Sequence, residues 1–346
     1  MDLKNILFYN FRNFKNASID IKPGLNLIYG ENGVGKTSFL EGLHLILTGG
    51  LFKDNYDALI RHGEELGGVS ANFTEGVREL EKIVYLRRDG VIREANKKRV
   101  TRMRSFKTHN TVVFEPYDTF LIDGSPSLRR KFLDDLISDV SLSYEKNLRD
   151  YNNLLKMRNN YLKFYPNPKR FLDALDEDYI RLIKEIDLER NRYLDLIKKR
   201  TKRHIYDIEP DWSVDFSIDY SYDKMDLHKF RDEHLIDDIN RKHSSWGAHK
   251  DDLIINFNDE LAKITASRGQ KRAIVVSMKL ANLDILKRLS NKESIILLDD
   301  LLYEFDEIRN SNLVNKIQGL TAFVTSTKLI SADSVIEIKN NEMKYI

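Results

Sequence analysis

The strongest constraint on this chain of 346 residues is one run of eight residues, Gly-Glu-Asn-Gly-Val-Gly-Lys-Thr, at positions 30–37. It fits the pattern G-x-x-x-x-G-K-[S/T], which a chain of this length and average composition matches by chance about once in a hundred. A short apolar strand is predicted just before it, at 25–29, and a helix with apolar residues at helical spacing just after it, at 37–47. Strand, glycine-rich turn and helix in this order predict an α/β fold with a phosphate-binding loop.

The chemistry of this loop explains the spacing of its residues. Glycines let the backbone curl, so that successive N–H groups can point at phosphate oxygens. Lys36 adds a positive charge toward the β and γ phosphates of a nucleotide, and the Thr37 hydroxyl is a suitable Mg²⁺ ligand. The alternative is a glycine-rich turn with an exposed lysine. The predicted nucleotide-binding residues are Gly30, Glu31, Asn32, Gly33, Val34, Gly35, Lys36, Thr37 and Ser38.

A second acidic motif lies far along the chain. Residues 294–298 are a mostly apolar run, and Asp299 and Asp300 follow it directly. Such a run predicts a buried strand of a parallel sheet, here beside the strand of the phosphate loop. Asp299 is then expected to support Mg²⁺ and Asp300 to hold or polarise an attacking water. Together with Lys36 they are the predicted catalytic residues; the alternative is a strand that ends in a solvated acidic turn.

A third motif, Ser-Arg-Gly-Gln-Lys-Arg at 267–272, precedes a predicted helix. A serine and a glycine at a helix N-terminus can donate to a phosphate, although an ordinary polar helix start would look the same. The segment resembles the signature motif of ABC-type ATPases, which in that family caps the γ-phosphate held by a second subunit. The resemblance makes Ser267, Gly269 and Gln270 candidate nucleotide contacts, and residues 303–306 resemble the D-loop of the same family.

The chain as a whole resembles the RecF family of bacterial recombination mediators, which are related to SMC proteins. The likeness runs nearly end to end and is carried by 10–14, 30–41, 59–63, 124–134, Tyr151, Arg158, Asn159 and 247–253. One departure is from the transport ATPases: no histidine follows the predicted strand at 322–325, so Thr325 or a neighbour would have to act as the γ-phosphate sensor.

The resemblance implies an α/β fold of the ABC-type ATPase head, with a mostly helical lobe inserted in it. Residues 1–124 are the predicted N-terminal part of the ATPase lobe, 125–245 the helical lobe, and 246–346 the C-terminal part with the signature, Walker B and D-loop motifs. Ser125 and Pro126 mark the start of the first inserted helix. On that helix Leu128 is expected on the packed face, and Arg130 to pair with Asp134 at i,i+4.

The resemblance also implies a function: a weak, DNA-stimulated ATPase that uses ATP and Mg²⁺. ATP would drive head-to-head dimerisation on DNA, slow hydrolysis would release the dimer, and recombinase would be loaded at single-strand gaps during repair, replication and the SOS response. Arg12 and Asn13 are implied nucleotide contacts. The implied partners are double-stranded and gapped or junction DNA, a second copy, RecR and RecO. Another SMC-like or P-loop ATPase, such as a kinase, and a DNA-binding protein with a vestigial ATP site remain alternatives.

Composition limits the remaining choices. Lys and Arg number 56 against 54 Asp and Glu, so the net charge of +2 excludes a strongly basic, histone-like protein. Local basic clusters remain, with a solvated face as the alternative; the stretch 93–107 supplies the candidate DNA contacts Lys97, Lys98, Arg99, Arg102 and Arg104, and 198–203 is a weaker cluster. The lack of cysteine, of an apolar leader and of an 18-residue apolar run predicts a cytoplasmic protein with no membrane partner.

Overall fold

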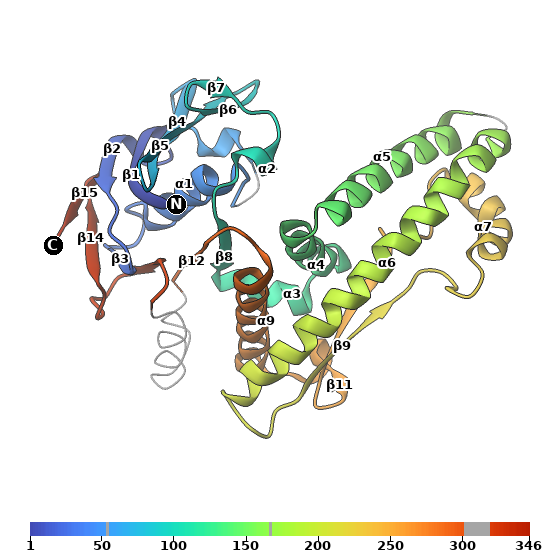
Figure 1. Ribbon diagram of the computed structural model, residues 1–346. Helices are drawn as coiled ribbons and strands as arrows, with labels where there is room; N and C mark the ends of the chain where they lie inside the picture. Colours follow the sequence, from blue (N-terminus) through green and yellow to red (C-terminus); the bar gives the residue numbers. More distant parts are fainter. Residues whose placement is uncertain (53–54, 166–167, 301–318) are drawn as a thin grey trace. The chain divides into compact units, whose positions relative to one another are not determined.

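The computed structural model describes residues 1–52, 55–165, 168–300 and 319–346 (Figure 1). The chain forms two compact units. The first unit combines the N-terminal residues 1–117 with the C-terminal residues 291–346, and the second is the intervening segment 118–290. Each unit has its own strands and helices and is described by itself.

The described residues of the first unit form two six-stranded sheets. One is antiparallel in the order β2-β1-β4-β5-β6-β7, with bounds β1 Asp2–Phe11, β2 Phe14–Asp20, β4 Leu66–Glu75, β5 Arg78–Arg87, β6 Gly90–Ala95 and β7 Lys98–Arg99. The other has the order β15-β14-β3-β13-β12-β8, with bounds β3 Leu25–Tyr29, β8 Asn110–Phe114, β12 Ser294–Leu298, β13 Ala322–Ser326, β14 Ser334–Lys339 and β15 Glu342–Tyr345. All neighbours in this second sheet are parallel except β15, which pairs antiparallel with β14.

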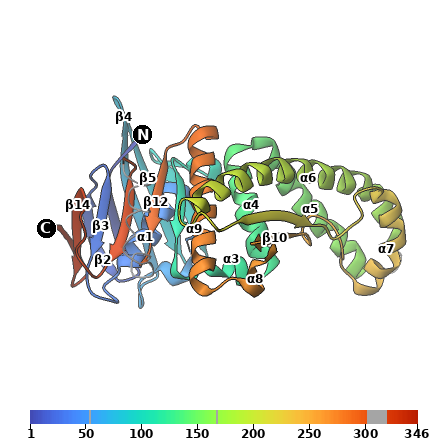
Figure 2. The same cartoon turned by 90° about the horizontal axis from the view of Figure 1, so that it is seen from below.

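Helix α1, Lys36–Thr48, connects the two sheets of the first unit (Figures 1 and 2). The ring of Phe39 lies 5.6 Å from that of Phe8 on β1 and 6.1 Å from that of Phe323 on β13. Most of the helix is buried, as expected for a helix that is apolar on nearly all sides. This packing fixes the loop that precedes α1 against both sheets. Shorter elements of the unit are η1 Asp57–Leu59 and α2 Met103–Phe106, while η2, Pro116–Thr119, spans the boundary.

The predicted neighbour of the acidic strand is wrong. The strand β12 was expected beside β3, yet β13 lies between them and pairs with both. The sequence signals that two strands are buried and parallel, but not which strand comes between them, because pairing order depends on contacts far apart in the chain. Both strands still end at the same edge of the sheet.

The second unit is mainly helical, as predicted. Its elements are α3 Phe120–Asp123, α4 Pro126–Val140, α5 Leu142–Phe164, α6 Lys169–Tyr206, β9 Val214–Asp219, α7 Leu227–Arg241, β10 Asp252–Phe257, β11 Glu260–Leu261, α8 Ala262–Thr265 and α9 Arg268–Leu289. Helix α6 packs against both α5 and α9, and the strands form the sheet β11-β10-β9. Helix α4 begins after Ser125 with proline in its first turn, as expected. Leu128 is exposed rather than packed, so that expectation is wrong.

The two compact units of the structure divide the chain differently from the predicted lobes over residues 246–290, which were predicted to belong to the ATPase lobe. In the structure this segment belongs to the second unit, because β10 pairs with β9 and α9 packs along α6. The division of the chain into lobes by function stays a prediction. Among the described residues, no helix has both the length and the apolar content needed to cross a bilayer.

A buried arginine holds the helices of the second unit together. Arg158 on α5 is fully buried and donates to Asp176 on α6 at 3.1 Å and to Asp238 on α7 at 2.7 Å. It also donates to Ser244 at 2.6 Å, and its guanidinium lies over the ring of Trp246. One side chain therefore links three helices and the segment that leads to β10.

We predict that Arg158→Ala destabilises the protein strongly, by about 3–5 kcal/mol, because it leaves Asp176 and Asp238 buried without their cation. Urea unfolding followed by circular dichroism measures the change. The matched control is Arg181→Ala on α6, which removes an exposed arginine paired with Asp178 and Glu185 and should change little. Equal effects of the two substitutions would contradict the role given to Arg158.

Candidate functional site

The phosphate-loop motif folds as the predicted strand, turn and helix, from β3 through residues 30–35 into α1. Gly33 and Gly35 have φ angles of +81° and +113°, in the left-handed region that favours glycine. A Cβ at Gly35 would also lie 3.2 Å from the ring of Phe14. The curl of the loop therefore favours glycine at both positions, and Gly35 also leaves room for the first β-hairpin.

Lys36 lies inside this curl. Its side chain is buried, and Nζ donates to the carbonyl oxygens of Gly30 at 3.0 Å and Glu31 at 2.9 Å. Asn13 supports the loop from outside, since its amide donates to the carbonyl oxygen of Gly33 at 2.9 Å. The sequence motif thus brings a cation and two carbonyl contacts into one loop, and the structure adds Asn13.

The acidic strand meets the loop through Thr37. The Thr37 hydroxyl lies 2.9 and 3.0 Å from the two carboxylate oxygens of Asp299, to which it donates. Thr325, on the intervening strand β13, donates to Asp299 at 3.1 Å and accepts from the backbone N–H of Asp300 at 2.8 Å. Thr325 thereby helps to hold the two acidic residues in place, and the expectation that Thr325 or a neighbour acts as the γ-phosphate sensor stays a prediction.

Arg12 and Glu41 form a close ion pair beside the loop. The guanidinium donates to both carboxylate oxygens, each at 2.8 Å, and the carboxylate is nearly fully buried on α1. Arg12 has a φ of +50°, so the turn after β1 aims this side chain at α1. The role of Arg12 as a nucleotide contact stays a prediction. Glu41 ends the stretch 30–41 that carries the family resemblance, but sequence analysis gave it no role at the site.

The residues at this edge of the sheet suit a nucleotide with Mg²⁺. Loop N–H groups and Lys36 match phosphate oxygens, while a hydroxyl and a carboxylate are oxygen donors of the kind Mg²⁺ takes. In the described ranges no three His, Asp or Glu side chains gather as a metal site of their own. A metal held here would therefore need oxygens from phosphate and water besides those of Thr37 and Asp299.

The signature segment starts α9 as predicted. Ser267 is the N-cap residue: its hydroxyl oxygen accepts from the N–H of Gln270 at 3.3 Å, and the Gln270 side-chain oxygen accepts from the N–H of Ser267 at 2.8 Å. Gly269 is exposed, with open space where a Cβ would stand. The capping box uses acceptor oxygens only, so the Ser267 hydroxyl hydrogen and the Gln270 amide hydrogens stay available as donors. The predicted D-loop, 303–306, lies outside the described residues.

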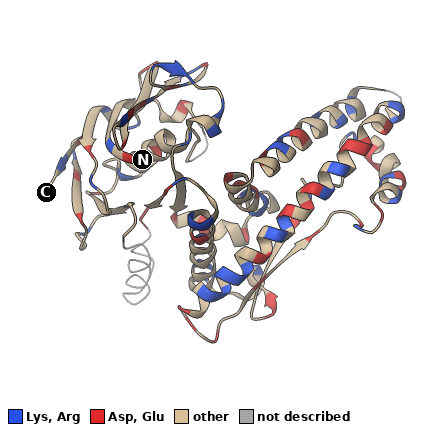
Figure 3. Cartoon of the chain, viewed as in Figure 1, with Lys and Arg blue, Asp and Glu red and all other residues tan. Residues whose placement is uncertain are grey.

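The predicted DNA contacts cluster around one hairpin of the first unit. Lys97, Lys98 and Arg99 are exposed at the turn and in the short strand β7, where the ribbon of Figure 3 is coloured blue, and Arg102 is exposed just beyond. Arg104 is half-buried on α2. The second predicted cluster, at 198–203 on α6 of the second unit, is partly neutralised, because Lys198 and Lys202 both pair with Asp215.

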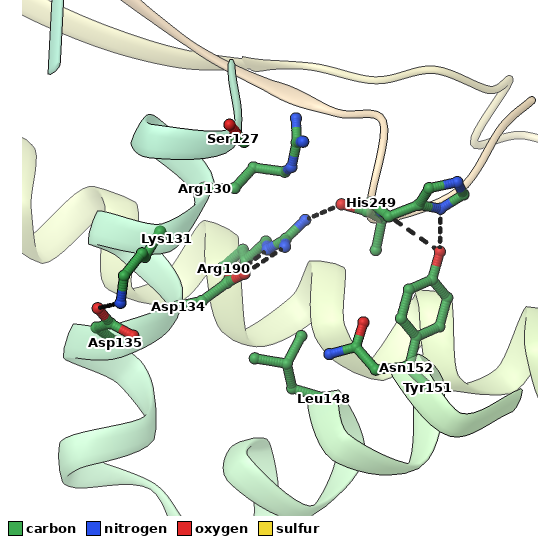
Figure 4. A pocket seen from close by; sticks show the side chains of 11 residues that line it. Ser127, Arg130, Lys131, Asp134, Asp135, Leu148, Tyr151, Asn152, Arg190 and His249 are labelled. Atoms are coloured by element: carbon green, nitrogen blue, oxygen red, sulfur yellow. Dashed lines mark hydrogen bonds and ion pairs between the residues drawn. The ribbon is translucent and has the colours of Figure 1, made fainter. Parts of the chain in front are cut away.

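A cavity of about 280 Å³ lies within the second unit, lined by α4, α5, α6 and the segment before β10 (Figure 4). The side chain of Arg190 lines this cavity and pairs with Asp134 at 3.0 Å and with Asp251 at 3.3 Å. The expected Arg130–Asp134 pair is therefore wrong. The buried Arg190 forms the ion pair with Asp134, and Arg130 donates to the backbone oxygen of Asp251 instead.

His249 forms one wall of this cavity. Its Nδ1 lies 2.8 Å from the hydroxyl of Tyr151 and its Nε2 3.3 Å from the carbonyl oxygen of Ser244. Burial lowers the pKa of His249 to about 4, so the ring is neutral in the folded protein at physiological pH.

We predict that His249 makes stability depend on pH between 6.5 and 4. The unfolded histidine takes up a proton near pH 6.5 and the folded one only near 4, so stability is fully present above 6.5 and falls as the pH drops, by up to about 3 kcal/mol. Denaturant unfolding at several pH values should show a weaker dependence in His249→Gln than in wild type. His243→Gln, at an exposed ring, is the control and should behave as wild type.

Comparisons with known proteins point to one family. Residues 6–209 match the family model of an AAA domain. The DNA replication and repair protein RecF of Streptococcus agalactiae serotype V is 32% identical over 95% of this chain and 92% of its own, and that of Natranaerobius thermophilus is 30% identical over 98% and 94%.

Solved structures agree with these relatives. A structure of the recombination mediator protein RecF with ATP, in the RecFOR pathway, matches with a TM-score of 0.91 at 27% identity over 99% of this chain and 97% of that one. The Smc head domain of Pyrococcus furiosus matches with a TM-score of 0.59 at 16% identity over 99% of this chain and 95% of that one. The second likeness shows a shared fold, that of an ABC-type ATPase head.

Proposed function

Because this chain belongs to the RecF family of DNA replication and repair proteins, we propose that it is an ATP-dependent DNA-binding protein that mediates recombination during DNA repair. The observation that carries the proposal is the contact between Thr37 of the phosphate loop and Asp299 of the acidic strand. The two motifs are 262 residues apart in sequence and meet at one edge of a sheet. Their meeting supports ATP as the ligand of the loop.

In this proposal the loop residues 30–38 bind the triphosphate. Lys36 turns its ammonium toward the β and γ phosphates, and Asn13 keeps the loop in its curled form. Thr37 and Asp299 would hold Mg²⁺, which would offset the negative charge that develops on the phosphates. Asp300 orients the attacking water as a general base. Arg12 would contact the nucleotide from the first hairpin.

The signature residues would complete the ATP site of a second copy. Ser267, Gly269 and Gln270 lie at the start of a 22-residue helix with hydrogen-bond donors still available. A γ-phosphate held by one copy would accept these donors from the other, so ATP would favour the dimer and hydrolysis would release it. A monomer would then hydrolyse ATP weakly, and DNA that holds two copies together would stimulate the reaction.

The DNA would be bound mainly through its phosphates. Lys97, Lys98, Arg99 and Arg102 are exposed side chains without the geometry of a base-reading helix, which suits contact independent of sequence. Arg104 would add to this charge. Duplex and gapped or junction DNA are the proposed substrates. RecR and RecO are the proposed protein partners, in line with the RecFOR pathway that the related structures name.

We predict that Lys36→Met abolishes ATP binding, whereas Ser267→Arg keeps ATP binding but abolishes dimerisation. The first removes the cation inside the loop, and the second places a bulky charge where the partner's phosphate would lie. Binding of a fluorescent ATP analogue and light scattering with and without ATP and Mg²⁺ measure the two effects separately.

The outcomes distinguish the rival functions. A metabolic P-loop enzyme would lose activity in Lys36→Met but would not respond to Ser267→Arg. A wild-type mass that is the same with and without ATP would contradict the shared site. Asp300→Asn serves as a third variant, since it should bind ATP and dimerise yet hydrolyse ATP slowly.

We also predict that replacing Lys97, Lys98 and Arg99 together by glutamine weakens binding to all duplex sequences alike. Each phosphate contact contributes roughly −0.9 to the slope of log K against log salt. The loss of three contacts should therefore make this negative slope shallower by about 3. Fluorescence anisotropy with labelled duplex at several salt concentrations measures this. The control pair Lys198→Gln and Lys202→Gln removes cations already paired with Asp215 and should change the slope less.

A further inference from the structure

The end of the hairpin formed by α5 and α6 exposes aromatic side chains. Phe164, Tyr165 and Phe171 are 67%, 47% and 41% exposed, and with Tyr161 we call them the aromatic tip. Large aromatic groups gathered at a surface usually mark a binding site, because water contact with them is unfavourable. The two helices run side by side up to this end in both views (Figures 1 and 2).

Three of the four rings of the aromatic tip, those of Tyr161, Tyr165 and Phe171, contact one another. Tyr161 and Phe171 stack with centroids 4.7 Å apart and planes only 5° apart. Tyr165 lies 5.0 Å from Tyr161 and 5.1 Å from Phe171, tilted against both. Beneath them, Tyr161 packs on a small buried core of Leu162, Leu172 and Leu235. Tyr161 is thus anchored on this core, and Tyr165 and Phe171 contact Tyr161 in turn.

The surroundings of these rings are basic. Lys163, Lys169 and Arg170 are exposed, and the ammonium of Lys163 lies 5.0 Å over the ring of Phe164. Residues 151–172 contain no Asp or Glu. In the described ranges these three cations have no carboxylate partner, and the nearest acid in sequence, Asp173, pairs with Arg231 of α7 at 2.7 Å.

We propose that the aromatic tip binds unpaired bases of single-stranded DNA. Phe164 and Tyr165 stack on the bases, and Lys163, Lys169 and Arg170 contact the phosphates. Exposed π-faces beside unpaired cations are the combination that single strands need, since every base has a face that can stack. Duplex DNA stacks its base faces inside the helix, so it would contact only the cations. An apolar peptide would offer the cations no negatively charged partner.

This inference rests on the proposed function, because it takes DNA as the partner, but it assigns a different part of the chain and a different form of DNA. The hairpin of β6 and β7 would contact duplex phosphates, whereas the aromatic tip would contact an unpaired segment. A protein with both surfaces prefers DNA in which a duplex adjoins a single strand.

The test is a single-stranded oligonucleotide that carries 2-aminopurine, whose fluorescence is quenched on stacking. Wild type should quench it, and the double variant Phe164→Leu with Tyr165→Leu should lose the quenching and at least tenfold in affinity. Duplex affinity should stay within about twofold. Tyr206→Leu changes an aromatic that is 61% exposed at the other end of α6 and should bind the single strand as wild type does.

A second variant separates stacking from charge. Lys163→Gln with Lys169→Gln should keep the quenching at low salt but lower the salt slope for single strands by about 1.4, since each phosphate contact contributes roughly 0.7. Single-strand affinity and quenching unchanged in the aromatic variant would overturn the proposal. So would light scattering that shows self-association of wild type, without DNA, lost in that variant, because the aromatic tip would then contact a second copy.

The proposed function fails in a different way. If wild type binds neither duplex nor single-stranded DNA with ATP, the proposed function is wrong and the inference falls with it. If wild type and the aromatic variant both dimerise with ATP and bind duplex equally, while neither quenches 2-aminopurine, only the role of the aromatic tip is wrong.

Discussion

The hydrogen bond between Thr37 and Asp299 is the interaction on which the first unit depends. It joins two segments from opposite ends of the chain, and it forms only because β13 pairs with both β3 and β12. Asp299 is nearly fully buried, a position that a carboxylate keeps only with hydrogen-bond donors around it. Hydroxyls from α1 and β13 supply these donors, so the sheet order and the acidic site stabilise each other.

The proposed ATP site draws on two groups of residues, one in each unit. In the first unit, the phosphate loop, Thr37 and Asp299 form a concentrated set of phosphate and metal partners at one sheet edge. In the second unit, the start of α9 has a capping box that satisfies its backbone while leaving donors free at an exposed position, which supports the proposal that it contacts the nucleotide of a second copy. A helix start that is already ordered loses little conformational freedom when it binds a phosphate.

In the second unit, buried charge stabilises the structure and exposed charge remains for binding. Arg158 and Arg190 are buried and each is paired with two carboxylates, which fixes how the helices pack. The cations of the aromatic tip are exposed and, among the described residues, pair with no carboxylate. The buried Arg158 network joins α5 and α6, and the rings of the aromatic tip lie near the end of the hairpin that these two helices form.

The sequence by itself determined the local features: the loop with its left-handed glycines, the strand that ends in Asp299 and Asp300, and the serine that starts α9. These depend on residues next to one another, so spacing and residue type suffice. It missed α7, whose cap residue Asp226 was a weak signal. Only the tertiary structure decided that β13 separates the two key strands, that Arg12 meets Glu41, and that Arg190 rather than Arg130 takes Asp134. Such choices depend on which charges become buried together, and that is set by packing between segments far apart in the chain.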